Sequence, residues 1–425
     1  MKECKLFVYI LNLSILFYFP ISIWSQNPWS QIAYLPDTTI HVQSIDFSIG
    51  DYGYIVGGMQ LGAPPWGVKN DFWKYNPLSD SWEQLIDFPR SISCGAGFVV
   101  DSIIYVTTGH DSLETDEIDS LYAWYPDWDH WVNLGAIPPD LRRTRAVGFS
   151  INGRGYITTG LSVSQIGYLE DLWEYNPSSN SWVEKSSFPG VSRYDAICFV
   201  VDNCAYIGLG SPLGSGGDCT ELWEYNSILD TWTQKASFIY PGVTGTTAFS
   251  VGNKGYVTLG HSLDPPYTFF NAIWEYDPVI DEWQQLNRFP GMIRAYASDF
   301  VINDIGYIVG GTFLYLPLNL DNWSFNPTLV SVDPKHMKNY SIFPNPCSST
   351  IKIQIPSNID GPYAIQIFNM MNASVLKTSS IHVNLNNTIE LNLRELSNGI
   401  YYVIIQNNNG EVLIKDKILK WNPII

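Results

Sequence analysis

Basic side chains recur at equivalent places in the first three quarters of the chain, where they could hold an anionic ligand. Arg143, Arg193 and Arg294 each lie six residues before a recurring phenylalanine, and another copy has His41 at this place. A guanidinium matches a carboxylate through two parallel hydrogen bonds, so these side chains could clamp an acidic sugar such as a sialic or uronic acid. The alternative is that each arginine only ties down its own loop, and we favour this structural role.

Two histidines, His110 and His261, each follow a glycine that ends a predicted strand. An imidazole changes its charge near neutral pH, so either ring could move a proton in a reaction. The two residues belong to the second and fifth of six repeated segments, on opposite sides of a six-fold arrangement. Bonds from zinc to histidine are only about 2 Å long, so we expect the rings to be too far apart to share a metal ion. A loop histidine is the favoured interpretation for both.

Four acidic residues crowd one predicted loop: Glu114, Asp116, Glu117 and Asp119. Carboxylates could hold Ca²⁺, which takes six to eight oxygen ligands in flexible geometry. Their spacing does not fit the D-x-[DN]-x-[DN]-G pattern of an EF-hand. A solvated acidic loop is therefore the favoured interpretation, and the calcium site is a weak candidate.

Other signatures of chemistry are missing from the sequence. Neither G-x-S-x-G, nor H-E-x-x-H, nor a phosphate-binding P-loop occurs, and no two cysteines have the C-x-x-C spacing. We therefore assign no catalytic residue and predict no cofactor.

The candidate residues belong to a repeated segment, represented by GYITTG from Gly155 and DLWEYNPSSNSW ending at Trp182. Its tyrosine recurs at intervals of 51, 51, 50, 50 and 51 residues, as Tyr54, Tyr105, Tyr156, Tyr206, Tyr256 and Tyr307. Each copy contains four strand-like pieces. The first ends in the phenylalanine, seven residues before the tyrosine, and a short Gly, Asn or Asp turn between them indicates a β-hairpin. The fourth begins at a tryptophan.

The sixth copy lacks the tryptophan of its fourth piece, but Trp29 precedes the first copy. The interval from Trp29 to Trp82 is 53 residues, close to the repeat period. We therefore predict that the N-terminal strand completes the last sheet beside the strand of Trp323. Six four-stranded sheets closed in this way hide the edge that an open array would expose.

A period near 50 residues with four strands in each unit is typical of kelch repeats. Residues 26–327 resemble a kelch-repeat β-propeller, with the glycine pair intact at Gly57-Gly58 and Gly310-Gly311. The predicted fold is therefore all-β, with a six-bladed propeller. The resemblance implies a ligand site at one mouth of the central channel, where loops on a rigid scaffold carry function.

Two enzyme families with kelch propellers offer a comparison. Galactose oxidase has seven blades and a copper site with a Tyr-Cys crosslink, which cannot be identified in this sequence. The sialic acid mutarotases are six-bladed and similar in size, so an enzyme of this kind is the alternative to a non-catalytic module.

The repeat stops after Pro327, and residues 328–339 have the character of a linker. Residues 340–425 contain several short alternating strands that predict a small Ig-like β-sandwich. This segment resembles the type A C-terminal sorting domain of the type IX secretion system of the Bacteroidota. The resemblance rests on a Pro-Asn-Pro motif, a Gly-Ile-Tyr-Tyr-Val strand and a basic last strand, represented by Pro344, Asn345, Pro346, Gly399, Tyr401 and Lys417. A generic Ig-like binding domain is the alternative.

The N-terminus has the pattern of a secretory signal peptide, predicted to span residues 1–25. Lys2 and Lys5 precede an apolar run from Leu6 to Ile23, which Pro20 interrupts near its end. A membrane anchor is the weaker alternative, because a spanning helix needs about 20 apolar residues. After cleavage we expect no membrane-spanning segment.

Charge is distributed unevenly between the two predicted domains. Residues 26–334 contain 13 Lys and Arg against 35 Asp and Glu, a net charge of −22, whereas residues 335–425 have 8 against 5. The strong negative charge of residues 26–334 argues against nucleic acid as a partner, because nucleic acid is also negatively charged. We expect a secreted or surface-exposed protein that passes through the periplasm, with the type IX machinery as one partner and an unknown glycan or protein as the other.

Overall fold

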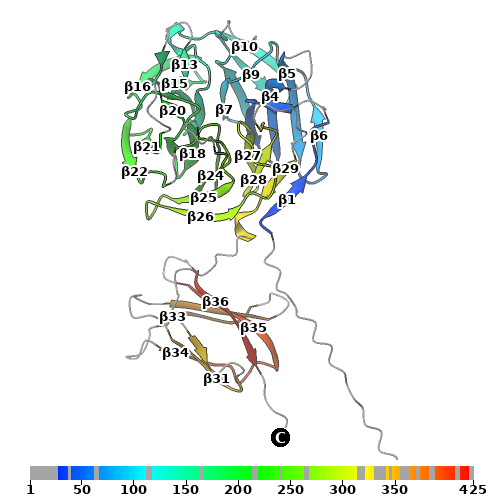
Figure 1. The fold of residues 1–425 in the computed structure, drawn as a ribbon, viewed down its shortest axis with the longest axis vertical. Helices are drawn as coiled ribbons and strands as arrows, with labels where there is room; N and C mark the ends of the chain where they lie inside the picture. The colour runs from blue at the N-terminus through cyan, green and yellow to red at the C-terminus, as the bar shows by residue number, and fades with distance from the viewer. Residues whose placement is uncertain are drawn as a thin grey trace, which may run out of the picture. The chain divides into compact units, whose positions relative to one another are not determined.

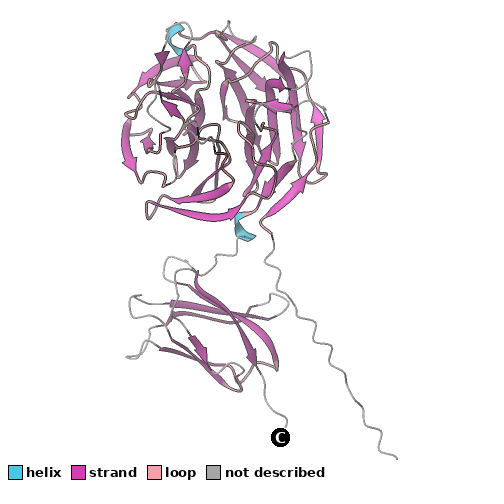
Figure 2. Ribbon diagram, in the orientation of Figure 1, coloured by secondary structure: helices cyan, strands magenta, loops and turns pink. Residues whose placement is uncertain are grey.

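The computed structural model divides the described residues into two compact units, one within Met1–Val330 and the other within Ser331–Ile425 (Figure 1). Almost all regular structure is β-strand, and the two helices are single 3₁₀ turns (Figure 2). The described residues are 27–36, 40–61, 67–111, 117–162, 167–212, 219–239, 242–262, 268–313, 321–329, 341–343, 347–354, 363–369, 374–381, 388–406 and 412–420.

The first unit is a six-bladed propeller, as the repeat predicts (Figure 1). Blades 1 to 3 consist of β3 (Ile45–Ile49), β4 (Tyr52–Leu61), β5 (Gly67–Asn76) and β6 (Ser81–Gln84); β7 (Ala96–Val100), β8 (Ile103–Thr107), β9 (Ser120–Tyr125) and β10 (His130–Ala136); and β11 (Val147–Ile151), β12 (Arg154–Thr158), β15 (Leu172–Asn176) and β16 (Ser181–Lys185). Blades 4 to 6 consist of β18 (Ile197–Val201), β19 (Cys204–Gly208), β21 (Leu222–Asn226) and β22 (Thr231–Lys235); β23 (Thr247–Val251), β24 (Lys254–Thr258), β25 (Ala272–Asp277) and β26 (Glu282–Arg288); and β27 (Ser298–Ile302), β28 (Ile305–Val309), β29 (Asn322–Phe325) and β1 (Trp29–Ile32).

The last blade is closed by the N-terminal strand. β1 pairs antiparallel with β29, with Trp29 opposite Phe325 and Gln31 opposite Trp323. Trp29 is buried, and its ring centroid lies 4.7 Å from that of Phe325. A strand from one end of the repeat array thus completes the sheet at the other end and covers its edge.

Sequence explains the hairpins that begin each blade. In β7 and the other first strands, buried and partly exposed residues alternate, which is the period of a strand with one face in a core. Asp202 and Asn203, which join the first two strands of blade 4, have φ angles of 50° and 60°. A two-residue hairpin turn of this kind needs positive φ at both positions, and Asn and Asp tolerate it.

Aromatic residues and small residues join neighbouring blades. The Phe98 and Tyr105 rings stack with centroids 5.3 Å apart, and Phe98 packs over Gly155 of the next blade. A Cβ atom at Gly155 would overlap the Phe98 ring, so the glycine makes room for the neighbouring blade. The Trp131 indole N–H also donates to the Ile86 carbonyl of the preceding blade at 3.2 Å. The repeated residues therefore serve the blade interfaces.

The second unit contains two sheets around one core. One sheet has β30 (Ser341–Phe343), β31 (Thr350–Gln354) and β34 (Thr388–Asn392), and the other has β32 (Tyr363–Asn369), β33 (Ser374–Ile381), β35 (Gly399–Gln406) and β36 (Val412–Lys420). Buried residues of both sheets, including Ile351, Ile389, Ile367 and Val403, form a single hydrophobic cluster. The strands predicted after residue 350 are present, while an Ig-like connection of the strands stays a prediction.

Several sequence-based predictions lie outside the described residues. These are the signal peptide, most of the linker, Glu114, Asp116, Pro344, Asn345 and Pro346. Within the described part of the chain, no helix has the length and apolar character needed to cross a bilayer.

Candidate functional site

The recurring arginines lie inside the blades, fully buried. Arg143 makes a two-pronged ion pair with Asp171, with both N–O distances 2.7 Å. Its remaining N–H groups donate to the carbonyls of Leu141, Thr159 and Asp140 at 2.8, 3.0 and 2.9 Å. All five donors of the guanidinium are used within the chain, which leaves none for a ligand.

The same arrangement recurs in two other blades, where Arg193 pairs with Glu221 and Arg294 pairs with Asp321. Blade 1 has a histidine at this place: His41 Nδ1 lies 3.0 Å from the Gly57 carbonyl, and its Nε2 lies 3.4 Å from Asp71.

In each of these blades the basic side chain contacts the carbonyl that lies 16 residues further on. That carbonyl belongs to a residue in the left-handed region, such as Thr159 with φ 58° or Leu209 with φ 54°. Such backbone is costly for residues other than glycine and persists only where the surroundings hold it. The geometry therefore favours the structural role set out in the sequence analysis, in which the arginine ties down its loop.

Two residues after these positions lies a second set of six equivalent residues, which we call the channel ring: Gln43, Cys94, Arg145, Asp195, Gly245 and Tyr296. Each precedes the first strand of its blade by two positions, and these first strands contact one another around the centre of the propeller. All six have left-handed backbone, with φ between 53° and 64°.

Backbone hydrogen bonds link the channel ring from blade to blade. Cys94 N donates to the Gln43 carbonyl at 3.0 Å, and Arg145 N to the Cys94 carbonyl at 2.7 Å. Asp195 N donates to the Arg145 carbonyl at 3.1 Å, and Gln43 N to the Tyr296 carbonyl at 3.3 Å. The main chain thus fixes where these side chains begin.

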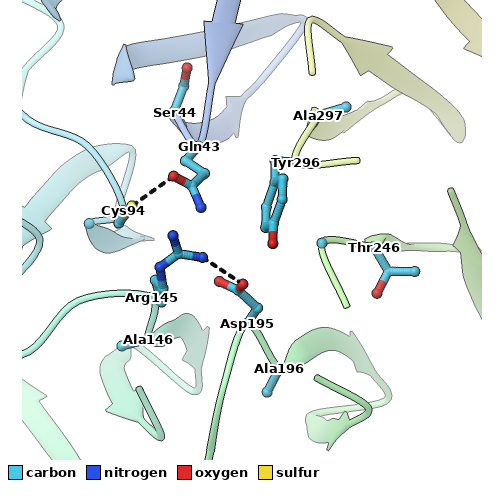
Figure 3. A pocket seen from close by; sticks show the side chains of 12 residues that line it. Gln43, Ser44, Cys94, Arg145, Ala146, Asp195, Ala196, Thr246, Tyr296 and Ala297 are labelled. Atoms are coloured by element: carbon cyan, nitrogen blue, oxygen red, sulfur yellow. Dashed lines mark hydrogen bonds and ion pairs between the residues drawn. The ribbon is translucent and has the colours of Figure 1, made fainter. Parts of the chain in front are cut away.

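The channel ring surrounds a cavity of about 150 Å³ (Figure 3). Arg145 Nη1 lies 2.8 Å from Asp195 Oδ2, which joins blades 3 and 4 by an ion pair. As drawn in Figure 3, the Cys94 thiol donates to Gln43 Oε1 at 3.0 Å. Rotating the amide by 180° lets its oxygen accept from Arg145 Nη1 and Nη2, at 2.9 and 3.1 Å. The rotated amide pairs with its neighbours at both ends and is the consistent assignment.

Aromatic rings flank the ion pair. The Arg145 guanidinium lies 5.5 Å from the centroid of Tyr194 and 5.7 Å from that of Tyr296. The Tyr296 hydroxyl points toward Asp195 in Figure 3, and its ring meets His261 edge-on at 5.8 Å between centroids. The cavity therefore has a charged side and an aromatic side.

Burial changes the proton affinity of the groups at the cavity. It raises the pKa of Cys94 to about 11, so the thiol stays neutral at physiological pH. Burial also raises the pKa of Asp195, against the opposing effect of Arg145. His110 lies on the same side of the propeller, and desolvation together with Arg145 lowers its pKa. The lowered pKa leaves His110 neutral near pH 7.

The predicted acidic loop is only partly described. Asp119 faces two arginines, with Arg90 at 3.5 Å and Arg142 at 3.9 Å, so its charge is compensated by cations of the chain. Glu117 is the other described member. Among the described residues, no group of three or more His, Cys, Asp or Glu is arranged to hold a metal ion.

A second cavity of about 210 Å³ continues the channel and shares Ser44 and Thr246 with the first. Asp46 of blade 1 and Asp299 of blade 6 lie in its wall, where Asp299 N donates to Asp46 Oδ2 at 3.2 Å. Burial raises the pKa of Asp46 to about 7. Burial and the neighbouring Asp46 raise that of Asp299. The two aspartates therefore meet across the junction of the first and last blades.

Sequence reasoning selected the buried arginines and missed the channel ring two residues further on. The signal was present, because aligning the six copies places these residues in one column whose members all differ. The arginines were selected because they recur from copy to copy. A residue that recurs in this way serves the structure that all blades share.

The described sorting residues belong to the second unit. Gly399 and Tyr401 lie in β35, and the buried Tyr401 hydroxyl donates to the Ser397 carbonyl at 3.0 Å. Lys417 lies in β36, opposite Tyr402 in the register of the two strands.

Comparisons with known proteins match both parts of the chain. A family model described as the secretion system C-terminal sorting domain matches residues 341–420. Kelch-like protein 23 of Mus musculus is 25% identical over 187 residues, which are 34% of this chain and 33% of that protein. The N-acetylneuraminate epimerase of Pasteurella multocida is 28% identical over 107 residues, which are 24% of this chain and 27% of that protein. The matches span about a third of the length of these curated relatives.

The solved structure of YjhT has a TM-score of 0.58 and 16% sequence identity, and it covers 69% of this chain and 95% of that chain. At this identity the likeness supports the fold alone. The sorting domain implies export by the type IX secretion system to the cell surface or the medium. Together with the six blades, these matches identify the chain as a kelch-type β-propeller protein with a type IX secretion system C-terminal sorting domain.

Proposed function

We propose that this protein is an exported, non-catalytic binding module whose ligand is a glycan held at the channel ring. The channel ring carries the proposal, because six positions share one backbone conformation while their side chains differ in every blade. The common backbone serves the fold. Because the fold does not require the side chains of the channel ring to differ, we attribute their differences to the ligand.

Size and chemistry favour a single sugar ring as the bound group. A space of about 150 Å³ limits the bound group to at most one six-membered ring, since a cavity of about that volume in another protein holds benzene. The cavity wall combines donors and acceptors on Arg145, Asp195 and Gln43 with the flat face of Tyr296. In ligand sites a few well-placed polar groups fix the orientation of the ligand, and Arg145, Asp195 and Gln43 can do so here.

A glycan array probed with the full-length exported chain tests the proposal. We expect binding that Tyr296→Ala weakens at least about tenfold, because the aromatic face is removed from the cavity. Trp128→Ala is the matched control, since Trp128 is 71% exposed on a turn outside the cavity. If no glycan binds, or if both variants lose binding equally, the channel ring is not a glycan site and a protein partner becomes the better candidate.

A sugar-acid mutarotase or epimerase is the second candidate. Two observations favour it: the partial similarity to an N-acetylneuraminate epimerase, and the presence of Asp195 and His261 beside the cavity as possible proton carriers. The buried arginines cannot clamp the carboxylate without giving up their own ion pairs, so Arg145 would have to do so. NMR of bound sugars separates the two functions: accelerated exchange of anomers or epimers that Arg145→Gln abolishes supports the enzyme, and binding without exchange supports the module.

Export is proposed to depend on residues 340–425. Deleting this segment should leave the propeller in the periplasm of a host that has the type IX system, because the sorting signal is lost. Fractionation and immunoblotting of the propeller provide the measurement. Normal release of the truncated protein would contradict the proposal.

A further inference from the structure

We infer that the channel ring selects uncharged sugars over sugars that carry a carboxylate, because its cation and its anion already neutralise each other. The inference rests on the proposed function, and it names the class of ligand for that site.

Arg145 and Asp195 are the charged side chains that line the cavity. Their contact at 2.8 Å is short enough for a charge-assisted hydrogen bond. The rotated Gln43 amide accepts two further bonds from the guanidinium. Arg145 is thus held from two sides by neighbours in the channel ring.

A ligand carboxylate would have to compete with this arrangement. It would either displace Asp195 from Arg145 or bring a second negative charge close to Asp195. The Asp195 side chain is only 11% exposed, so water screens it poorly and like charges repel strongly there. Displacement would leave Asp195 buried without its partner, which is a large penalty for a mostly buried ion.

A hydroxylated ring meets no such penalty. Neighbouring hydroxyl groups can donate to the Asp195 carboxylate and accept from the Arg145 guanidinium while the ion pair stays intact. The apolar face of the sugar can lie on Tyr296. Gly245 gives that ring its space, since a Cβ atom there would lie 2.9 Å from Tyr296 Cε1. The channel ring therefore presents two surfaces to a sugar: the Arg145–Asp195 pair, which is polar without net charge, and the aromatic face of Tyr296.

Matched sugars test the inference. The full-length chain is titrated with methyl glucoside and methyl glucuronide, and with methyl galactoside and methyl galacturonide, and is applied to an array of neutral, uronic and sialylated glycans. We expect the neutral member to bind at least about tenfold more tightly, as the loss of one charged hydrogen bond would produce. Asp195→Asn keeps the shape and leaves the Arg145 charge unbalanced, so its preference should move toward the carboxylated member. Asp127→Asn, an exposed site outside the cavity, is the control.

The outcomes separate the inference from the proposed function. If the unchanged protein prefers carboxylated sugars, the inference is overturned while glycan binding stands. An Asp195→Asn protein that folds and keeps the neutral preference also overturns it. If no sugar of any class binds, both the proposed function and the inference fail. Should the variant not fold, the preference of the unchanged protein decides the question.

Discussion

Because Asp46 and Asp299 are buried side by side, we predict that the stability of the propeller depends on pH. The substitution Asp46→Asn replaces one carboxyl group of the pair with a neutral group of the same shape. Its amide oxygen can still accept the hydrogen bond from Asp299 N, which measures 3.2 Å in the unchanged protein. The variant therefore removes the charge and keeps the contact.

The sign follows from proton binding. Burial raises the pKa of Asp46 from 3.8 to about 7, so between these values the folded state binds more protons than the unfolded state. Stability then falls as the pH rises through this window. At 1.36 kcal/mol for each pKa unit, ionisation of Asp46 costs at most about 4 kcal/mol at pH 8. Asp46→Asn does not incur this cost.

Urea unfolding at pH 4.5, 6, 7 and 8 measures the effect through tryptophan fluorescence, since all described tryptophans belong to the propeller. We expect the variant and the unchanged protein to be similar at pH 4.5. At pH 8 the variant should be more stable by about 2 to 4 kcal/mol. The control Asp127→Asn should show no such trend. A variant that is less stable at pH 8, or a difference that does not vary with pH, would refute the reasoning.

Three further substitutions test the blade interfaces and the buried ion pairs. Gly155→Ala should destabilise the propeller by about 1 to 3 kcal/mol, because the new methyl group overlaps the Phe98 ring, and thermal unfolding measures the loss; an unchanged Tm would show that the ring can move aside. Arg143→Gln should cost about 3 to 5 kcal/mol by leaving Asp171 without its buried partner, whereas a folded variant of normal stability would remove the structural role. Trp29→Ala should cost about 3 to 5 kcal/mol and loosen the closing strand, with faster amide exchange in β29 as the readout; protection that stays unchanged would argue against closure through this strand.

The sequence by itself determined the blade count and the order of the strands. Tyrosine, phenylalanine and tryptophan recur at regular intervals in the sequence, because every blade fills the same kind of interface with the same rings. The position of Trp29 also follows from counting, since five fourth-strand tryptophans leave one sheet incomplete. The sorting segment was recognisable for a similar reason, because its motif lies at the end of the chain where the repeat has stopped.

The candidate site could not be predicted in the same way. Arg143 and Arg145 are two residues apart, and the sequence contains no sign of which one enters a blade and which one faces the channel. Left-handed backbone at Arg145 itself, with φ 56°, decides it: Arg145 lines the cavity, while Arg143 turns inward to Asp171.

Contacts between residues far apart in the sequence could not be predicted from the sequence either. Asp46 and Asp299 are separated by 253 residues and meet only because the ring of blades closes. Local spacing determines the blades, since each is built from residues close in sequence. The closed ring of blades alone decides which side chains share the channel, because that depends on contacts between segments that no local pattern connects.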